Sequence, residues 1–110
     1  MAEAIARGQV WMLRRERPDK RRPVLVLSRD GLLAVLQTAT VALITSTRRG
    51  SPIEVELGVA DGLKADCAVN LANVFTVEKS LLHQYVATLS EAKMARICAA
   101  LALAVGCDDE

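Results

Sequence analysis

The sequence predicts a small, mainly β domain: an antiparallel barrel of about five to seven short strands, closed by one C-terminal helix. Short apolar runs rich in Val, Ile and Leu alternate with turn-forming residues along most of the chain. After Ser90, apolar positions instead recur at three/four spacing, which is typical of a helix with one buried face. The 110 residues, 52% of them hydrophobic, suit a single domain over 1–110 with one core.

The first half of the chain is expected to supply three strands. Residues 9–13 follow a glycine and predict the first strand. Residues 23–27 predict the second strand. Its first residue is a proline, and at that position the missing N–H costs no hydrogen bond inside the strand ladder. Residues 38–44 are a continuous, β-branched run, so we expect a third strand buried on both faces. Residues 14–21 form a loop with a Pro-Asp turn signal, and residues 32–37 fit either a helical turn or irregular structure.

The second half is expected to supply shorter strands and the helix. Residues 53–57 alternate apolar and acidic side chains, which predicts a half-exposed strand. Three further segments follow: a strand at 67–71 that 73–76 continue or follow, a short helical turn at 77–82, and a last strand at 86–89. Ser90 is a suitable N-cap for the helix, because its hydroxyl can accept a bond from a first-turn N–H, and Gly106 suits its C-terminal end.

Charge is distributed unevenly along the chain. The formal net charge of +1 indicates no particular partner, but residues 7–22 hold seven Lys or Arg and only two acids. Basic clusters lie where expected strands meet loops: Lys20, Arg21 and Arg22 before the second strand, and Arg48 and Arg49 after the third. Cationic side chains on a rigid β scaffold suit a polyanion, and RNA is the polyanion we favour.

Several kinds of site are disfavoured by composition. Aromatic residues are limited to Trp11, Phe75 and Tyr85, which argues against a platform of stacked bases. The chain has one histidine and three cysteines without CxxC pairing, so we expect no zinc site and no cofactor, and the cysteines are expected to be small buried hydrophobes. No apolar leader follows the first charge, and residues 97–105 span only about half a membrane. We therefore expect a cytoplasmic protein with no membrane contact.

The chemistry that remains for RNA is that of arginine and hydroxyl groups. Cleavage through the 2′-hydroxyl requires loss of a proton, protonation of the leaving oxygen and stabilisation of a phosphorane. Two histidines commonly share the proton transfers, but His83 is alone and is expected to be a satisfied surface or boundary residue. A guanidinium beside a short hydroxyl donor can stabilise a phosphorane without a metal or histidine.

Six segments, in order, resemble the MazF/PemK family of toxin endoribonucleases from bacterial toxin–antitoxin pairs. They are GQVW at 8–11, RRPVLVLS at 21–28, LITST at 43–47, DGLKADCAVNL at 61–71, FTVEK at 75–79 and LSEAKM at 89–94. The resemblance implies a homodimeric, SH3-like β-barrel of the CcdB/MazF type. It implies sequence-specific, metal-independent cleavage of single-stranded RNA to a 2′,3′-cyclic phosphate and a 5′-hydroxyl. It also implies a cognate MazE-like antitoxin whose disordered tail covers the RNA groove.

The resemblance also implies roles for particular residues. Arg22 matches the family's catalytic arginine before the proline of the second strand, and Thr45 matches its catalytic threonine in an Ile-Thr-Ser turn. Arg22 is expected to neutralise the scissile phosphate and Thr45 to hydrogen-bond a phosphate oxygen. Asn73 and Cys67 match positions that contact RNA in family members. Further RNA contacts are expected from Lys20, Arg21, Ser46, Arg48 and Arg49.

One departure from the family concerns the loop before the second strand. Residues 14–20 replace the longer Gly-Ser-Glu-type loop of many members, so the RNA sequence that a better-known member cuts cannot be transferred to this chain. Two alternatives stay open: a non-enzymatic, CcdB-like toxin that binds gyrase, and an inactive RNA-binding relative. The cut sequence, the RNA class and the general base are not specified by the sequence.

Overall fold

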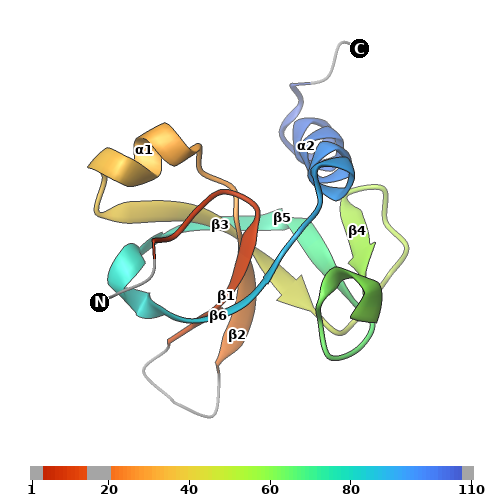
Figure 1. The fold of residues 1–110 in the computed structure, drawn as a ribbon. Helices are drawn as coiled ribbons and strands as arrows, with labels where there is room; N and C mark the ends of the chain where they lie inside the picture. The colour runs from red at the N-terminus through yellow and green to blue at the C-terminus, as the bar shows by residue number, and fades with distance from the viewer. Residues whose placement is uncertain (1–3, 15–20, 108–110) are drawn as a thin grey trace.

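The computed structural model describes residues 4–14 and 21–107, and its strands form a single antiparallel sheet (Figure 1). The six strands are β1 (Gln9–Leu13), β2 (Arg22–Val26), β3 (Thr38–Thr45), β4 (Glu54–Leu57), β5 (Cys67–Glu78) and β6 (Leu82–Thr88). They lie in the order β4-β5-β3-β2-β1-β6. Helix α1 (Asp30–Val35) and helix α2 (Glu91–Val105) lie well apart, at the two ends of the curled sheet (Figure 1). The prediction of a mainly β domain with a C-terminal helix is confirmed.

The expected closure of the sheet into a barrel is wrong. The strand order ends at β4 and β6, and these two edge strands do not pair within the described residues. At its end β6 leads directly into α2, and α2 rather than β6 packs against β4 and β5. A helix packs where a closing ladder was expected, and the sheet therefore stays open.

The apolar residues form two clusters, one on each face of the sheet. Leu25 belongs to the cluster that packs under α2, whereas its neighbours Val24 and Val26 belong to the cluster that contains Trp11 and Leu33. This alternation is that of a strand covered on both faces. Strand β2 is therefore held by packing above and below and by ladders to β1 and β3 on its two sides.

Several boundaries differ from those predicted. The ambiguous segment at 32–37 contributes to α1, and the turn predicted at 77–82 is shortened to the 3-10 helix η3 (Lys79–Leu81) because β5 continues through Glu78. Strand β6 begins at Leu82, well before the predicted 86–89. Both strands extend through polar residues on their exposed side, which interrupted the apolar runs used for prediction. A further 3-10 helix, η2 (Val59–Asp61), precedes β5.

The two ends of α2 are capped as predicted. The Ser90 hydroxyl accepts a hydrogen bond from the backbone N–H of Lys93 at 3.1 Å, and Gly106 ends the helix with a φ of +77°. Ile97, on the inner face of α2, is fully buried. Cys98 is exposed, however, and so is Cys107, so the expected burial of the cysteines holds for Cys67 alone. No helix in the described part of the chain is long and apolar enough to cross a membrane.

Candidate active site at the ends of β2 and β3

The two residues predicted to be catalytic lie at one end of the sheet. Strand β2 begins at Arg22 and strand β3 ends at Thr45. These strands pair antiparallel with Val24 opposite Leu43, and continuing that register by two residues places Arg22 opposite Thr45. Because Val24 is fully buried, the strand end that carries Arg22 is fixed by the core.

A hollow of about 640 Å³ opens beside this strand end, and we call it the Arg22 hollow. Its walls come from β1, β2, β3, β6 and the segment that leads into β5. The residues with charged, hydroxyl or thiol groups that line it are Arg22, Thr45, Ser46, Lys64, Asp66, Cys67 and Tyr85. Both predicted catalytic residues therefore share one cavity with two further predicted contacts, Ser46 and Cys67.

The Thr45 hydroxyl is already oriented by the backbone. Its Oγ1 accepts a hydrogen bond from the backbone N–H of Thr47 at 3.1 Å, as in a hydroxyl-capped turn. A hydroxyl has one proton to donate besides its acceptor lone pairs, so this bond leaves the Thr45 proton free. Thr45 is half-buried, and it can present this donor to an anion that enters the hollow.

Arg22 is exposed and makes no ion pair with any carboxylate of the described residues. A guanidinium offers a planar fork of donors that matches two oxygens of a phosphate. Lys64, which the sequence-based reasoning missed, adds a second cation to the same hollow. Lys64 lies within the DGLKADCAVNL segment, but only the folded chain brings that segment against β2 and β3.

Cys67 is buried at the start of β5 and lines the Arg22 hollow. Burial raises the pKa of the Cys67 thiol, the nearby Asp61 and Asp66 raise it further, and Arg48 partly offsets them. The thiol therefore stays protonated at neutral pH, and Cys67 is neither a nucleophile nor a base there. His83 does not line this hollow. It is half-buried, as expected of a boundary residue, but neither ring nitrogen has a hydrogen-bond partner among the described residues, so the side chain is not satisfied there as predicted.

A second hollow, of about 420 Å³, adjoins the first at Thr45, and we call it the Arg49 hollow. It is lined by Thr45, Thr47, Arg49 and Asn70 among others. Thr45 thus stands between two hollows that each hold an arginine. Asn70 was missed by the sequence-based reasoning.

The predicted Asn73 lies close to the Arg49 hollow without lining it. It is in an exposed bulge of β5, because the β3 register shifts from Val74 to Asn70 across this point. The described structure thus places Asn70, rather than Asn73, in the hollow beside Thr45.

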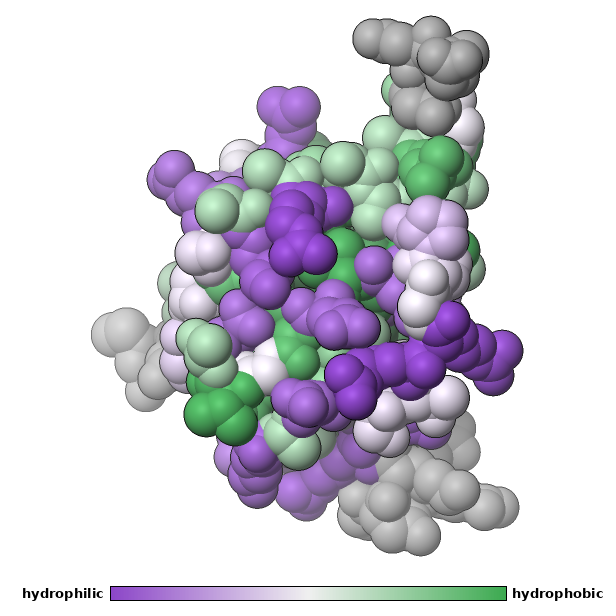
Figure 2. Space-filling view, turned by 90° about the vertical axis from the view of Figure 1, so that its right-hand side faces the viewer, coloured by the Kyte–Doolittle hydropathy of each residue, from purple (hydrophilic) through white to green (hydrophobic). Residues whose placement is uncertain are grey.

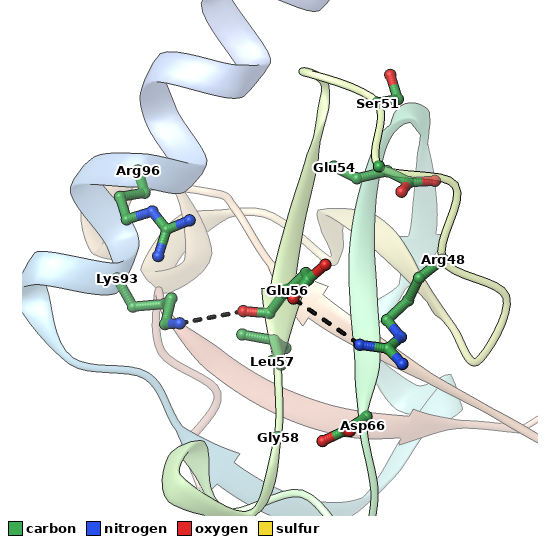
Figure 3. A pocket seen from close by; sticks show the side chains of 10 residues that line it. Arg48, Ser51, Glu54, Glu56, Leu57, Gly58, Asp66, Lys93 and Arg96 are labelled. Atoms are coloured by element: carbon green, nitrogen blue, oxygen red, sulfur yellow. Dashed lines mark hydrogen bonds and ion pairs between the residues drawn. The ribbon is translucent and has the colours of Figure 1, made fainter.

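Arg48 faces a third hollow, of about 540 Å³, between β4 and α2 (Figure 3). Its guanidinium lies 3.8 Å from the carboxylate of Glu56, and Arg96 extends from α2 toward the same space. The molecular face that carries β4 is largely hydrophilic (Figure 2). Asp66 lines both this hollow and the Arg22 hollow. Arg48 therefore lies in the cavity next to the one that Arg22 and Thr45 line.

The remaining predicted contacts are placed as follows. Arg21 is exposed immediately before β2 and does not line the Arg22 hollow. Lys20 lies outside the described residues. Over residues 4–14 and 21–107, no group of three or more His, Cys, Asp or Glu side chains is arranged to hold a metal ion.

Similar sequences and structures come from mycobacteria. The chain is 41% identical over 108 residues to the probable endoribonuclease MazF5 of Mycobacterium tuberculosis, covering 97% of this chain and 98% of that protein. It is 34% identical over 104 residues to the probable endoribonuclease MazF2 of the same species, covering 94% and 100%. A mycobacterial endoribonuclease solved in complex with its cognate antitoxin superimposes with a TM-score of 0.87 at 30% identity, covering 97% of this chain and 100% of that one.

The M. tuberculosis toxin MazF-mt6 superimposes with a TM-score of 0.82 at 29% identity, covering 91% of this chain and 98% of that one. The family model of PemK-like, MazF-like toxins of type II toxin–antitoxin systems matches residues 6–105. That match includes every residue of the Arg22 hollow. The chain therefore belongs to the PemK-like, MazF-like family of toxins.

Proposed function

We propose that this chain is the endoribonuclease toxin of a type II toxin–antitoxin pair. It cleaves single-stranded RNA at a specific sequence, without a metal ion, and leaves a 2′,3′-cyclic phosphate and a 5′-hydroxyl. The observation that carries the proposal is the meeting of Arg22 and Thr45 at one hollow, where the guanidinium has no ion-pair partner among residues 4–14 and 21–107 and the hydroxyl proton is free to donate. The endoribonuclease names of the relatives support it and do not favour the gyrase-binding alternative.

In this mechanism the substrate supplies its own nucleophile. The 2′-hydroxyl loses its proton to solvent and attacks the adjacent phosphorus, the bond to the 5′-oxygen breaks, and that oxygen takes a proton from solvent to become the 5′-hydroxyl. Negative charge builds meanwhile on the non-bridging oxygens of the phosphorane. The Arg22 fork neutralises that charge and the Thr45 hydroxyl donates to one of those oxygens. A guanidinium does not give up its proton, so the contribution of Arg22 in this proposal is electrostatic. Cys67 does not take the 2′-hydroxyl proton, because burial keeps its thiol neutral.

Phosphates on either side of the cut are bound by the surrounding cations in this proposal. Arg49 would bind a phosphate in the Arg49 hollow, and Lys64 would bind one in the Arg22 hollow. The other contacts in the proposal are Lys20, Arg21, Ser46, Arg48 and Asn73.

The proposal extends to partners and location. A homodimer, a MazE-like antitoxin and a cytoplasmic location form part of it, as does an SH3-like arrangement of the strands. The similar mycobacterial endoribonuclease in complex with its cognate antitoxin supports the antitoxin. Acidic and apolar residues of an antitoxin tail would suit the basic edge formed by the strand ends.

The test is cleavage of total RNA by purified protein in EDTA, followed by sequencing of 5′-hydroxyl ends. Wild type should yield discrete ends, and Arg22→Ala should yield none while its thermal melting is unchanged, because Arg22 is exposed. Arg22→Lys is the matched control: it keeps the charge and loses the fork, so it should cut far more slowly than wild type. Full cleavage by a folded Arg22→Ala variant would refute the proposal, and intact RNA with gyrase inhibition would favour the CcdB-like alternative.

A further inference from the structure

One aromatic residue lines the Arg22 hollow, and composition alone did not indicate this. Tyr85, on the edge strand β6, is 42% exposed and lines the cavity together with Arg22 and Thr45. The other two aromatic residues are less exposed: Trp11 is 5% exposed and Phe75 is half-buried against the core. Tyr85 is therefore the one aromatic ring of the chain that is available to a ligand in this cavity.

The ring of Tyr85 is held from two sides. Trp11 pairs opposite Tyr85 in the β1–β6 ladder, and their ring centroids lie 5.9 Å apart at an interplanar angle of 79°. This edge-to-face contact covers at most one face of the tyrosine ring. At its other end the Tyr85 hydroxyl lies 2.6 Å from the hydroxyl of Thr88.

The supporting tryptophan is fixed in turn. The Trp11 Nε1–H donates a hydrogen bond to Oε1 of Gln9 at 2.9 Å, and the same oxygen accepts from the backbone N–H of Ala6 at 2.8 Å. A ring that is fixed before a ligand arrives loses little conformational freedom when it binds. Tyr85 differs from an ordinary surface tyrosine in two ways: it packs on a buried aromatic ring, and it lines the hollow that contains Arg22 and Thr45.

We propose that Tyr85 is a substrate-binding residue on which one unpaired base beside the scissile phosphate stacks. The inference rests on the proposed function and deepens it, because it assigns the base contact that orients the RNA over Arg22 and Thr45. Stacking uses the π-face that every base has, and larger purine rings cover more of the tyrosine than pyrimidines do. The single platform also agrees with the scarcity of aromatic residues, since the chain can hold only one base in this way.

The test uses short RNAs that carry a cut site mapped with the wild-type protein. Tyr85→Leu should lower kcat/KM by about ten- to a hundredfold, which is the usual effect of removing one stacking ring. Tyr85→Phe keeps the stacking ring and loses only the hydroxyl contact to Thr88, so its loss in kcat/KM should be much smaller than that of Tyr85→Leu. Thr88→Ala removes the same contact from the other side and should match Tyr85→Phe. Thermal melting of all variants shows whether a loss reflects unfolding.

A second measurement separates stacking from a structural role. Each base near the cut is replaced in turn by an abasic nucleotide, and the loss in kcat/KM is measured for wild type and for Tyr85→Leu. Stacking predicts one position whose abasic replacement is costly for wild type and nearly neutral for Tyr85→Leu. A purely structural tyrosine would instead lower the rate by the same factor at every position.

Three outcomes overturn the inference while the proposed function stands: unchanged kcat/KM in Tyr85→Leu, equal losses in Tyr85→Phe and Tyr85→Leu, or no position-specific coupling to an abasic site. Failure of the proposed function is seen separately and earlier, as a wild-type protein that produces no 5′-hydroxyl ends.

Discussion

Replacement of Thr45 by valine separates chemistry from folding at the candidate site. Valine has nearly the shape of threonine and retains its β-branching, so the end of β3 should keep its conformation. The change removes the free hydroxyl proton and also the acceptor for the Thr47 N–H. Two effects are therefore expected, one on catalysis and one on stability, and they have different magnitudes.

The stability effect should be small. The lost hydrogen bond is 3.1 Å long, and Thr47 is exposed, so water can replace Oγ1 as the partner of its N–H. A single hydrogen bond of this kind contributes about 0.5–1.5 kcal/mol, and we expect the low end. The catalytic effect should be large, because removal of one donor to a developing oxyanion typically costs about 10²–10³ in rate, or about 2.7–4 kcal/mol.

The assay is kcat/KM on a short RNA with the mapped site, measured beside urea unfolding of the same preparations. Thr45→Ser is the control: it retains both the donor and the turn acceptor, and it should cut within about tenfold of wild type. A Thr45→Val protein that cuts within about threefold of wild type would refute the assignment of Thr45 as a phosphate donor. So would a loss of cutting that follows only from unfolding.

Two further predictions concern the surroundings of the site. Arg48→Ala should reduce the salt dependence of RNA binding by about one unit of log–log slope, measured in the slow-cutting Thr45→Val background. Little change in stability is expected, because the ion pair of Arg48 with Glu56 is solvent-exposed. An unchanged slope would remove Arg48 from the phosphate contacts. The raised pKa of Cys67 means that the folded state favours the protonated thiol. The stabilisation that Cys67 contributes is therefore complete at neutral pH and is lost as pH rises through the folded-state pKa. Urea unfolding from neutral to alkaline pH should therefore show a steeper fall for wild type than for Cys67→Ala, and parallel curves would contradict the expected linkage.

Most strands were predictable because the apolar runs coincide with the buried parts of the sheet. Both ends of β1, β2 and β3 lie within one residue of those predicted, since each strand carries several buried apolar residues in a short run. The closure of the sheet was not predictable from such runs. It depends on whether β6 or α2 reaches β4, and periodicity gives no information on that choice between elements.

The candidate site was predictable only where a local motif marked it. Arg22 stands before the proline that opens β2, and Thr45 stands in the turn after a buried strand, so both have local signals. Asn70 and Tyr85 have none, because they reach the hollows through pairings between strands that are distant in sequence. Lys64 lies in the segment before β5, and only the folded chain brings that segment to the Arg22 hollow. The scarcity of aromatic residues argues against a row of stacked bases, and it leaves room for the single stacking ring proposed at Tyr85.

The position of these residues in the sheet suggests how chemistry and RNA choice are divided. Strands β2 and β3 are interior, with a ladder on each side, so the geometry of Arg22 against Thr45 is fixed by two neighbours apiece. Tyr85 is on β6, an edge strand that pairs on one side only, and its support comes from a side-chain contact with Trp11. An edge strand can change its exposed side chains without disturbing an interior ladder. In the proposed function, substitutions on β6 would therefore alter which RNA is held while Arg22 and Thr45 stay in place, so this edge is where RNA preference can vary at least cost to catalysis.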